Sequence, residues 1–200
     1  MMKISIIMLL SLIGVTSCHF QHKNDVMALP FNRGISEMIT TQKLEESQDI
    51  IYGIYTYETS ELGGFRIGDI NLSTYKYPES AAADYNNIEI YVDSRASQHY
   101  LGFRYTTVKQ DEIAQLLDYL KTHYPEFEQR KDAGGEAYFW DIKALDAWLF
   151  YYPSTSVARN EKEFLHSNFL FVKKGTRMEN SRDTSYNTIL DNFNMMYPVN

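Results

Sequence analysis

Short segments in which apolar and polar residues alternate recur along this chain, and they constrain its fold more than any other feature. In residues 87–93, Ile88, Ile90 and Val92 are separated by more polar side chains. Alternating residues lie on opposite faces of a β-strand, so this pattern gives one buried face and one wet face. The sequence therefore predicts antiparallel strands.

Seven such segments are flanked on both sides by turn-forming residues. Strands are predicted over residues 50–58, 65–76, 87–93, 100–108, 137–142, 147–153 and 163–174. The short connection between the third and fourth segments predicts a hairpin.

Two stretches have helical spacing instead. The clearer one is residues 109–124, where a single apolar stripe runs along the helix before Pro125 ends it. The stripe consists of Ile113, Leu116, Leu117, Leu120 and Tyr124. Residues 35–46 predict a second main helix, and residues 186–197 predict a short terminal helix.

These elements predict an α+β fold, an antiparallel sheet of about six or seven strands with two main helices packed on one face. Residues 30–180 form a single globular domain in this interpretation, and residues 181–200 form a linker and a short helix. Each main helix precedes three or four strands, which is typical of an internal duplication, although the residues themselves show no repeat.

The N-terminus has the form of a secretory signal. Lys3 precedes an apolar run from Ile4 to Val15. This run is too short for a transmembrane helix, which needs about 20 apolar residues. A positive start, a short apolar run and small residues at its end predict a signal peptide over residues 1–17.

Val15-Thr16-Ser17-Cys18 resembles the lipobox of bacterial lipoproteins, and the resemblance covers residues 1–18. It implies that Cys18 receives a diacylglycerol, that cleavage follows Ser17, and that the new amine is acylated. Residues 18–29 then form a lipidated tether, and the protein is anchored to a membrane of the bacterial envelope. The alternatives are a plain secretory signal with an incidental cysteine, or a buried core cysteine.

The net charge and the composition limit the kinds of partner that this chain can bind. The formal charge is −7, and removal of the signal peptide takes away one lysine more. Such a chain lacks the basic patch that neutralises phosphates, so no nucleic-acid partner is expected. Cys18 is the single cysteine, and stability must come from packing, for which the chain has 16 Tyr, 11 Phe and 2 Trp.

Catalytic and metal-binding motifs are missing from the sequence. It contains neither G-x-S-x-G nor H-E-x-x-H, and its glycine pairs lack the setting of a phosphate loop. His99, His123 and His166 are scattered singly. We therefore expect no catalytic residue, no metal and no cofactor.

One aromatic cluster is a candidate binding surface. Tyr138, Trp140, Trp148 and Tyr152 lie on two neighbouring predicted strands. A solvent-facing ladder of these rings would stack sugars or anchor a protein partner. The interpretation that we favour instead buries the strand pair beneath the 109–124 helix.

The sequence favours a non-enzymatic binding module, tethered to the envelope, with a protein partner. A glycan- or peptidoglycan-acting enzyme that uses an Asp/Glu acid–base pair is one alternative, and it predicts a carboxylate with a raised pKa. A structural envelope lipoprotein without a discrete ligand is the other.

Overall fold

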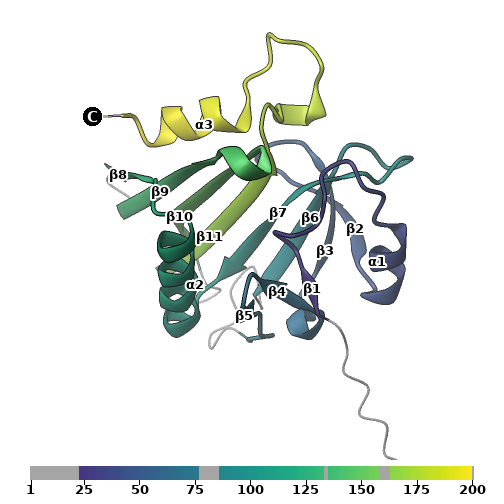
Figure 1. Ribbon diagram of the computed structural model, residues 1–200, viewed down its shortest axis with the longest axis horizontal. Coiled ribbons are helices and arrows are strands. Elements are labelled where there is room, and N and C mark those ends of the chain that lie inside the picture. Colours follow the sequence, from purple (N-terminus) through teal and green to yellow (C-terminus); the bar gives the residue numbers. More distant parts are fainter. Residues whose placement is uncertain (1–22, 77–85, 133–134, 158–162, 200) are drawn as a thin grey trace, which may run out of the picture.

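A large antiparallel sheet organises the molecule, shown in Figure 1 as a computed structural model. The structure describes residues 23–76, 86–132, 135–157 and 163–199. The strands of this sheet are β2 (Glu45–Gln48), β3 (Tyr55–Thr59), β6 (Asn87–Val92), β7 (Tyr100–Thr107), β8 (Glu128–Asp132), β9 (Gly135–Ile142), β10 (Ala147–Val157) and β11 (Glu163–Lys173). Their spatial order is β2-β3-β6-β7-β11-β10-β9-β8.

The sheet consists of two four-stranded meanders. Strands β2, β3, β6 and β7 pair in sequence as antiparallel neighbours, and so do β8, β9, β10 and β11. The meanders meet where β7 pairs with β11, with Phe103 opposite Phe171. Helix α1 (Ser36–Thr41) precedes the first meander and helix α2 (Gln110–His123) the second. This repeated order matches the internal duplication that the sequence suggests.

A small second sheet closes one end of the domain. It consists of β1 (Asn24–Asp25), β4 (Phe65–Ile67) and β5 (Ile70–Asn71), and β1 runs parallel to β4. One carboxylate oxygen of Asp25 accepts hydrogen bonds from the backbone N–H groups of Met27 and Gly68. The packed structure therefore already includes Asn24, within the range 18–29 expected to form the tether.

The first core face of the large sheet lies under α1 and α2. From α2, Ile113, Leu116 and Leu120 are buried against a cluster that includes Phe169 and Trp140. Burial of each such aliphatic side chain contributes about 1.5–3 kcal/mol. The helix predicted over 109–124 is thus confirmed as α2, with its apolar stripe toward the sheet.

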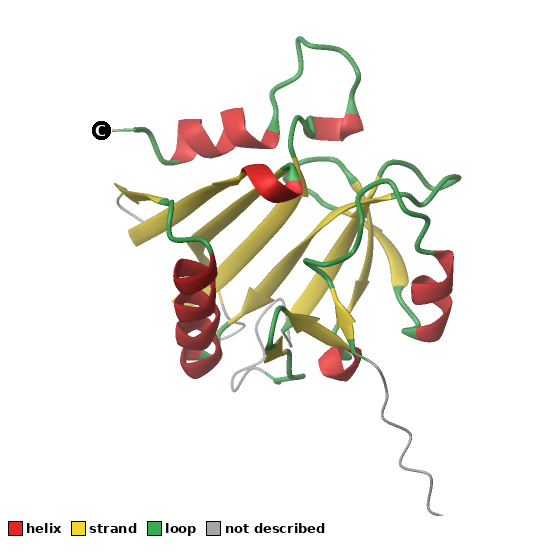
Figure 2. Ribbon diagram, viewed as in Figure 1, coloured by secondary structure: helices red, strands yellow, loops and turns green. Residues whose placement is uncertain are grey.

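The second core face is covered by the C-terminal segment, including η3 (Met178–Asn180) and α3 (Ile189–Met196) (Figure 2). Ile189 and Phe193 pack on Phe139 and Phe150 of the sheet. Thr188 begins α3 with a capping box, because its hydroxyl accepts the N–H of Asp191 and the Asp191 carboxylate accepts the N–H of Thr188. The predicted short terminal helix is confirmed.

The prediction of an α+β fold with two main helices is wrong. The described chain is mostly β, with eleven strands in two sheets and three α-helices, of which α2 alone exceeds eight residues. The helix predicted over 35–46 ends at Thr41. Thr40 and Thr41 are β-branched and bond back to the carbonyls of Ser36 and Glu37. Lys43 then takes a positive φ of 51°, which ends the helical path.

The predicted number of strands was too low because several strands carry no apolar alternation or are very short. The edge strands β2 (EESQ) and β8 (EQRKD) are polar throughout and carry no alternation, while β1, β4 and β5 are two or three residues long. The segment predicted as one strand over 65–76 is broken at Gly68, whose φ is 56°. A sheet with apolar side chains on both faces also needs cover on both faces, so α2 and α3 lie on opposite sides.

Candidate functional site

The turn between β2 and β3 exposes aliphatic side chains. We call residues 49–53 the Ile50 turn. The Ile50 side chain is 95% exposed and that of Ile51 is 46% exposed, whereas Asp49 at the start of the turn is 1% exposed. A single exposed apolar residue is ordinary. Here two adjacent isoleucines are exposed at the tip of a turn that begins with a buried carboxylate.

Asp49 fixes the shape of this turn. Its Oδ1 atom accepts the backbone N–H groups of Ile51 at 2.7 Å and Tyr52 at 2.9 Å. Its backbone carbonyl accepts the N–H of Gly53 at 2.8 Å. Gly53 has a φ of 68°, and a Cβ there would lie 2.9 Å from Glu179 Cγ, so glycine is needed at this position. The backbone under Ile50 is therefore rigidly held.

A buried ionic network supports Asp49 from below. We call Asp49, Glu89, Tyr91 and Arg104 the Arg104 network. Arg104 Nη1 lies 3.0 Å from Asp49 Oδ2, and Arg104 Nη2 donates to both carboxylate oxygens of Glu89 at 2.7 and 2.9 Å. The Tyr91 hydroxyl also donates to Asp49 Oδ2. One guanidinium on β7 thus joins the Ile50 turn to β6.

Burial sets the protonation of this network. Burial raises the pKa of the Glu89 carboxyl, and the Arg104 guanidinium opposes part of that rise. Burial lowers the pKa of Arg104, but Tyr91 and the two carboxylates raise it by more, so Arg104 stays charged. Burial also raises the pKa of the Tyr91 phenol, which remains a hydrogen-bond donor.

Two more tyrosines lie close to the Arg104 network. Burial raises the pKa of the Tyr52 and Tyr152 phenols. Neither hydroxyl makes a hydrogen bond within the described residues. Arg104 Nε is unpaired there as well. The network is therefore tightly bonded toward the Ile50 turn and less complete toward β10.

Beside it, the same sheet face carries polar side chains that bond to one another. Thr106 donates to Asn168 Oδ1 at 3.0 Å, and Asn168 Nδ2 donates to Ser154 Oγ at 3.0 Å. His166 lies opposite Ser154 in the β10–β11 pair, and burial together with Arg104 lowers its pKa. Thr106, Asn168 and Ser154 therefore satisfy one another's hydrogen bonds across β7, β11 and β10, as expected of a structural polar cluster.

The connection after β6 brings a serine, a histidine and an aspartate together without the geometry of a catalytic triad. His99 Nδ1 lies 3.1 Å from Asp93 Oδ2. Ser97 donates its hydroxyl proton to Asp93 Oδ1 at 2.5 Å. Since the serine is bonded to the carboxylate, the imidazole is not placed to take its proton.

The structure separates the four aromatic residues that the sequence singles out. Tyr138 and Trp140 are 7% and 0% exposed and lie on the α2 face, where Trp140 Nε1 donates to the Tyr124 carbonyl. Tyr152 is buried on the opposite face beside Tyr197, and Trp148 is half-buried there. They form no single exposed ladder. Cys18, the expected lipid site, lies outside the described residues.

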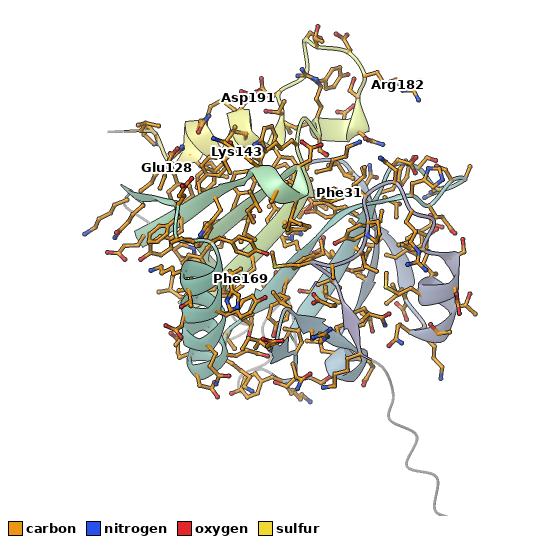
Figure 3. All side chains as sticks on the ribbon, viewed as in Figure 1. Phe31, Glu128, Lys143, Phe169, Arg182 and Asp191 are labelled. Atoms are coloured by element: carbon orange, nitrogen blue, oxygen red, sulfur yellow. The ribbon has the colours of Figure 1, made fainter. Side chains whose placement is uncertain are left out.

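Figure 3 shows how densely side chains fill the space on both sides of the sheet, with Phe169 between the central strands and α2. Over the described ranges, no group of three or more His, Cys, Asp or Glu side chains is arranged to hold a metal ion. No helix in those ranges has the length and apolar character needed to cross a membrane.

Sequence reasoning missed the Ile50 turn and the Arg104 network. Arg104 is a lone charge within an apolar strand segment, and Gly53 interrupts the segment predicted as a strand over 50–58. Those two signals mark a buried ion pair and a turn. The partners of Arg104 are 15 and 55 positions away in the chain, so spacing does not reveal them.

Comparisons with protein families, curated proteins and solved structures find no match to this chain.

Proposed function

We propose that this chain is a lipoprotein of the bacterial envelope, anchored through lipid on Cys18, that acts as a non-enzymatic binding module for a protein partner. The observation that carries the binding proposal is the Ile50 turn. Its tip residue is 95% exposed, while the aspartate that shapes it is 1% exposed. The partner is expected to bury Ile50 and Ile51 in an apolar pocket.

Rigid presentation of an apolar side chain favours affinity. Association costs free energy for each side chain and loop that must be ordered, and a preformed turn lowers this cost. The Arg104 network fixes the Ile50 turn before any partner arrives, through the 3.0 Å contact between Arg104 and Asp49. An anchor that fills a desolvated pocket at the centre of an interface contributes more binding free energy than a contact at the rim.

The position of the turn supports a partner on the side away from the anchoring membrane. β3 begins beside the Ile50 turn and leads toward η1 (Leu62–Gly64). The carbonyl of Gly64 accepts a hydrogen bond from Asn24 on β1, next to residue 23, where the described chain begins (Figure 1). In a chain lipidated at Cys18, residues 18–23 span at most about 20 Å. The end with Asn24 is then held near the membrane, and the Ile50 turn lies at the other end of β3.

One observation favours the enzymatic alternative. Burial raises the pKa of Glu89, which is the property expected of a general acid, and a second carboxylate, Asp49, lies on the other side of Arg104. However, both Glu89 oxygens already accept from Arg104, and both carboxylates are almost fully buried. The geometry of the Arg104 network therefore supports a binding module better than it supports an enzyme.

The test is site-specific photo-crosslinking in the producing bacterium. A benzoylphenylalanine is placed at position 50 and, as a matched control, at position 195, because the Met195 side chain is also exposed, by 63%, but lies on α3. We expect a defined crosslinked protein from position 50 only. The Ile50→Asp variant should then lose that partner in a pull-down while its Tm stays unchanged. Equal crosslinking from both positions, or none from position 50, would contradict the proposal.

A further inference from the structure

The C-terminal segment that follows β11 is attached to the Ile50 turn through η3. The backbone N–H of Glu179 donates to the Tyr52 carbonyl at 2.6 Å. A Cβ on Gly53 would lie 2.9 Å from Glu179 Cγ, so these two residues pack closely. The side-chain amide of Asn180 donates to the carbonyl of Asp93, directly after β6. η3 is therefore held by two loops of the first meander. We call Glu179 and Asn180 the latch.

The backbone of the latch is strained. Glu179 has a φ of 55° and Asn180 a φ of 49°, both in the left-handed region. Residues other than glycine enter this region at a cost, asparagine more easily than glutamate, and they normally do so singly. Two adjacent residues of this kind persist only where the surrounding structure holds them there. The hydrogen bonds to Tyr52 and Asp93 supply that hold.

Backbone hydrogen bonds connect the latch to the start of α3. The chain leaves η3, forms a loop and returns beside η3 before α3 begins (Figure 2). A β-bridge joins Arg177, before the latch, to Thr188, the residue that caps α3. The N–H of Ile189 donates to the Thr176 carbonyl at 3.0 Å. A displacement of η3 therefore also displaces the first turn of α3.

α3 covers the second core face and is attached at both of its ends. Ile189 and Phe193 are 0% and 1% exposed, because they pack against β9 and β10. Arg130 holds the C-terminal end through the Tyr197 carbonyl. The latch is the corresponding attachment at the N-terminal end. Opening the latch would uncover the apolar side chains beneath the first turn of α3.

We propose that Glu179 and Asn180 form a strained conformational latch, which holds the C-terminal segment closed over the second core face and opens when the Ile50 turn is displaced. Backbone strain favours the open state, and the contacts with Tyr52 and Asp93 favour the closed state. Whatever changes the turn therefore changes this balance, and the coupling is reciprocal. The latch stands on the structure alone, whereas its control by a partner that binds Ile50 rests on the proposed function.

The first test measures the strain. The Glu179 side chain is exposed, so Glu179→Gly acts mainly through the backbone. Glycine adopts the left-handed region without strain, and we expect Tm to rise by about 2–4 °C. Glu126→Gly is the matched control, since Glu126 is exposed and its φ is not positive, and it should not raise Tm. An equal change in the two variants, or a lower Tm for Glu179→Gly, would overturn the proposal.

The second test breaks the latch without changing its backbone preference. Asn180→Asp keeps a residue that tolerates the left-handed region but removes the N–H donor to Asp93. We expect the Ile189 amide to exchange with deuterium about fivefold faster in the full mature chain, with α2 unchanged. Asn32→Asp is the control, because Asn32 also has a positive φ but uses its oxygen, to accept from Lys173. Equal acceleration in α2, or no acceleration at Ile189, would contradict the latch.

The third test measures the coupling from the side of the turn. Asp49→Asn removes the carboxylate that shapes the Ile50 turn. We expect faster exchange at Ile189 as well as at Ile51, whereas the exposed control Asp69→Asn should change neither. Faster exchange at Ile51 alone would show that the latch does not respond to the turn. These measurements use no partner, so a failure of the latch is distinguishable from a failure of the crosslinking test above.

Discussion

The guanidinium of Arg104 on β7 lies 3.0 Å from the Asp49 carboxylate at the start of the Ile50 turn. The side chain of Asp49 is completely buried and that of Arg104 is 11% exposed. A charge pair so well removed from water is costly unless each partner is held by further hydrogen bonds. Here Asp49 also accepts two backbone N–H groups of the turn, and Arg104 also binds Glu89. This ion pair therefore fixes the exposed Ile50 turn to the buried interior of the sheet.

Arg104→Met should destabilise the protein by about 3–5 kcal/mol, because it leaves two buried carboxylates without a cation. Chemical denaturation measures this loss. The control is Arg95→Met, which removes an ion pair with Glu46 whose side chains are 65% and 45% exposed. That exposed pair should contribute less than about 1 kcal/mol. Comparable losses in the two variants would show that the Arg104 network does not hold the fold.

Asp49→Asn should loosen the Ile50 turn. The amide is neutral, so the ion pair with Arg104 is lost, and the bonds to the N–H groups of Ile51 and Tyr52 weaken. We expect these two amides to exchange faster with deuterium and the captured partner to dissociate faster. Asp69→Asn is the control, since the Asp69 side chain is 84% exposed. Unchanged exchange at Ile51 would argue against the bracing role of Asp49.

Glu89→Gln should change how stability depends on pH. Burial raises the folded-state pKa of Glu89 above its unfolded value, so its favourable contribution is full at acid pH and is lost as the pH rises through the folded pKa. The variant lacks this titration. Relative to the variant, the wild type should therefore gain stability as the pH falls. Glu45→Gln on the exposed part of β2 is the control, and urea unfolding over a pH series measures the difference. A constant difference across pH would refute the expectation.

Arg130→Gln should release α3 from the sheet. Arg130 Nη1 donates to Asn194 Oδ1 at 2.6 Å and to the Tyr197 carbonyl at 2.9 Å, and its guanidinium lies over Phe193. Hydrogen bonds from a charged donor contribute about 1.5–3 kcal/mol each. We expect faster exchange in residues 189–196 and a lower Tm. The neighbouring exposed variant Lys131→Gln should leave both unchanged.

Cys18→Ser should release the protein from membranes. If the lipobox-like sequence is processed as proposed, the wild type carries acyl chains that each contribute about 0.8 kcal/mol per buried CH₂ group. The variant has no thiol for the first lipid. Cell fractionation together with metabolic labelling by a fatty-acid analogue measures the change. A variant that remains membrane-bound and labelled would show that Cys18 is not the attachment site.

Local pattern in the sequence determined the elements whose side chains repeat regularly. The stripe from Ile113 to Leu120 defined α2, and the apolar alternation from Ile88 to Val92 defined β6. Helical periodicity near the C-terminus defined α3. In each case the period of the apolar residues equals the period of the structure, so one short window contains the whole signal.

Tertiary structure alone decided the edge strands and the candidate site. β2 and β8 are polar, and they are strands because a neighbouring strand supplies their hydrogen-bonding partners. Likewise, Asp49, Glu89 and Arg104 meet because two strands, β6 and β7, and the Ile50 turn converge on one face of the sheet. The sequence by itself determined where the chain can form regular elements. Which distant charges would be buried together depended on the register of the sheet, because an ion pair is set by distance in space and not by separation along the chain.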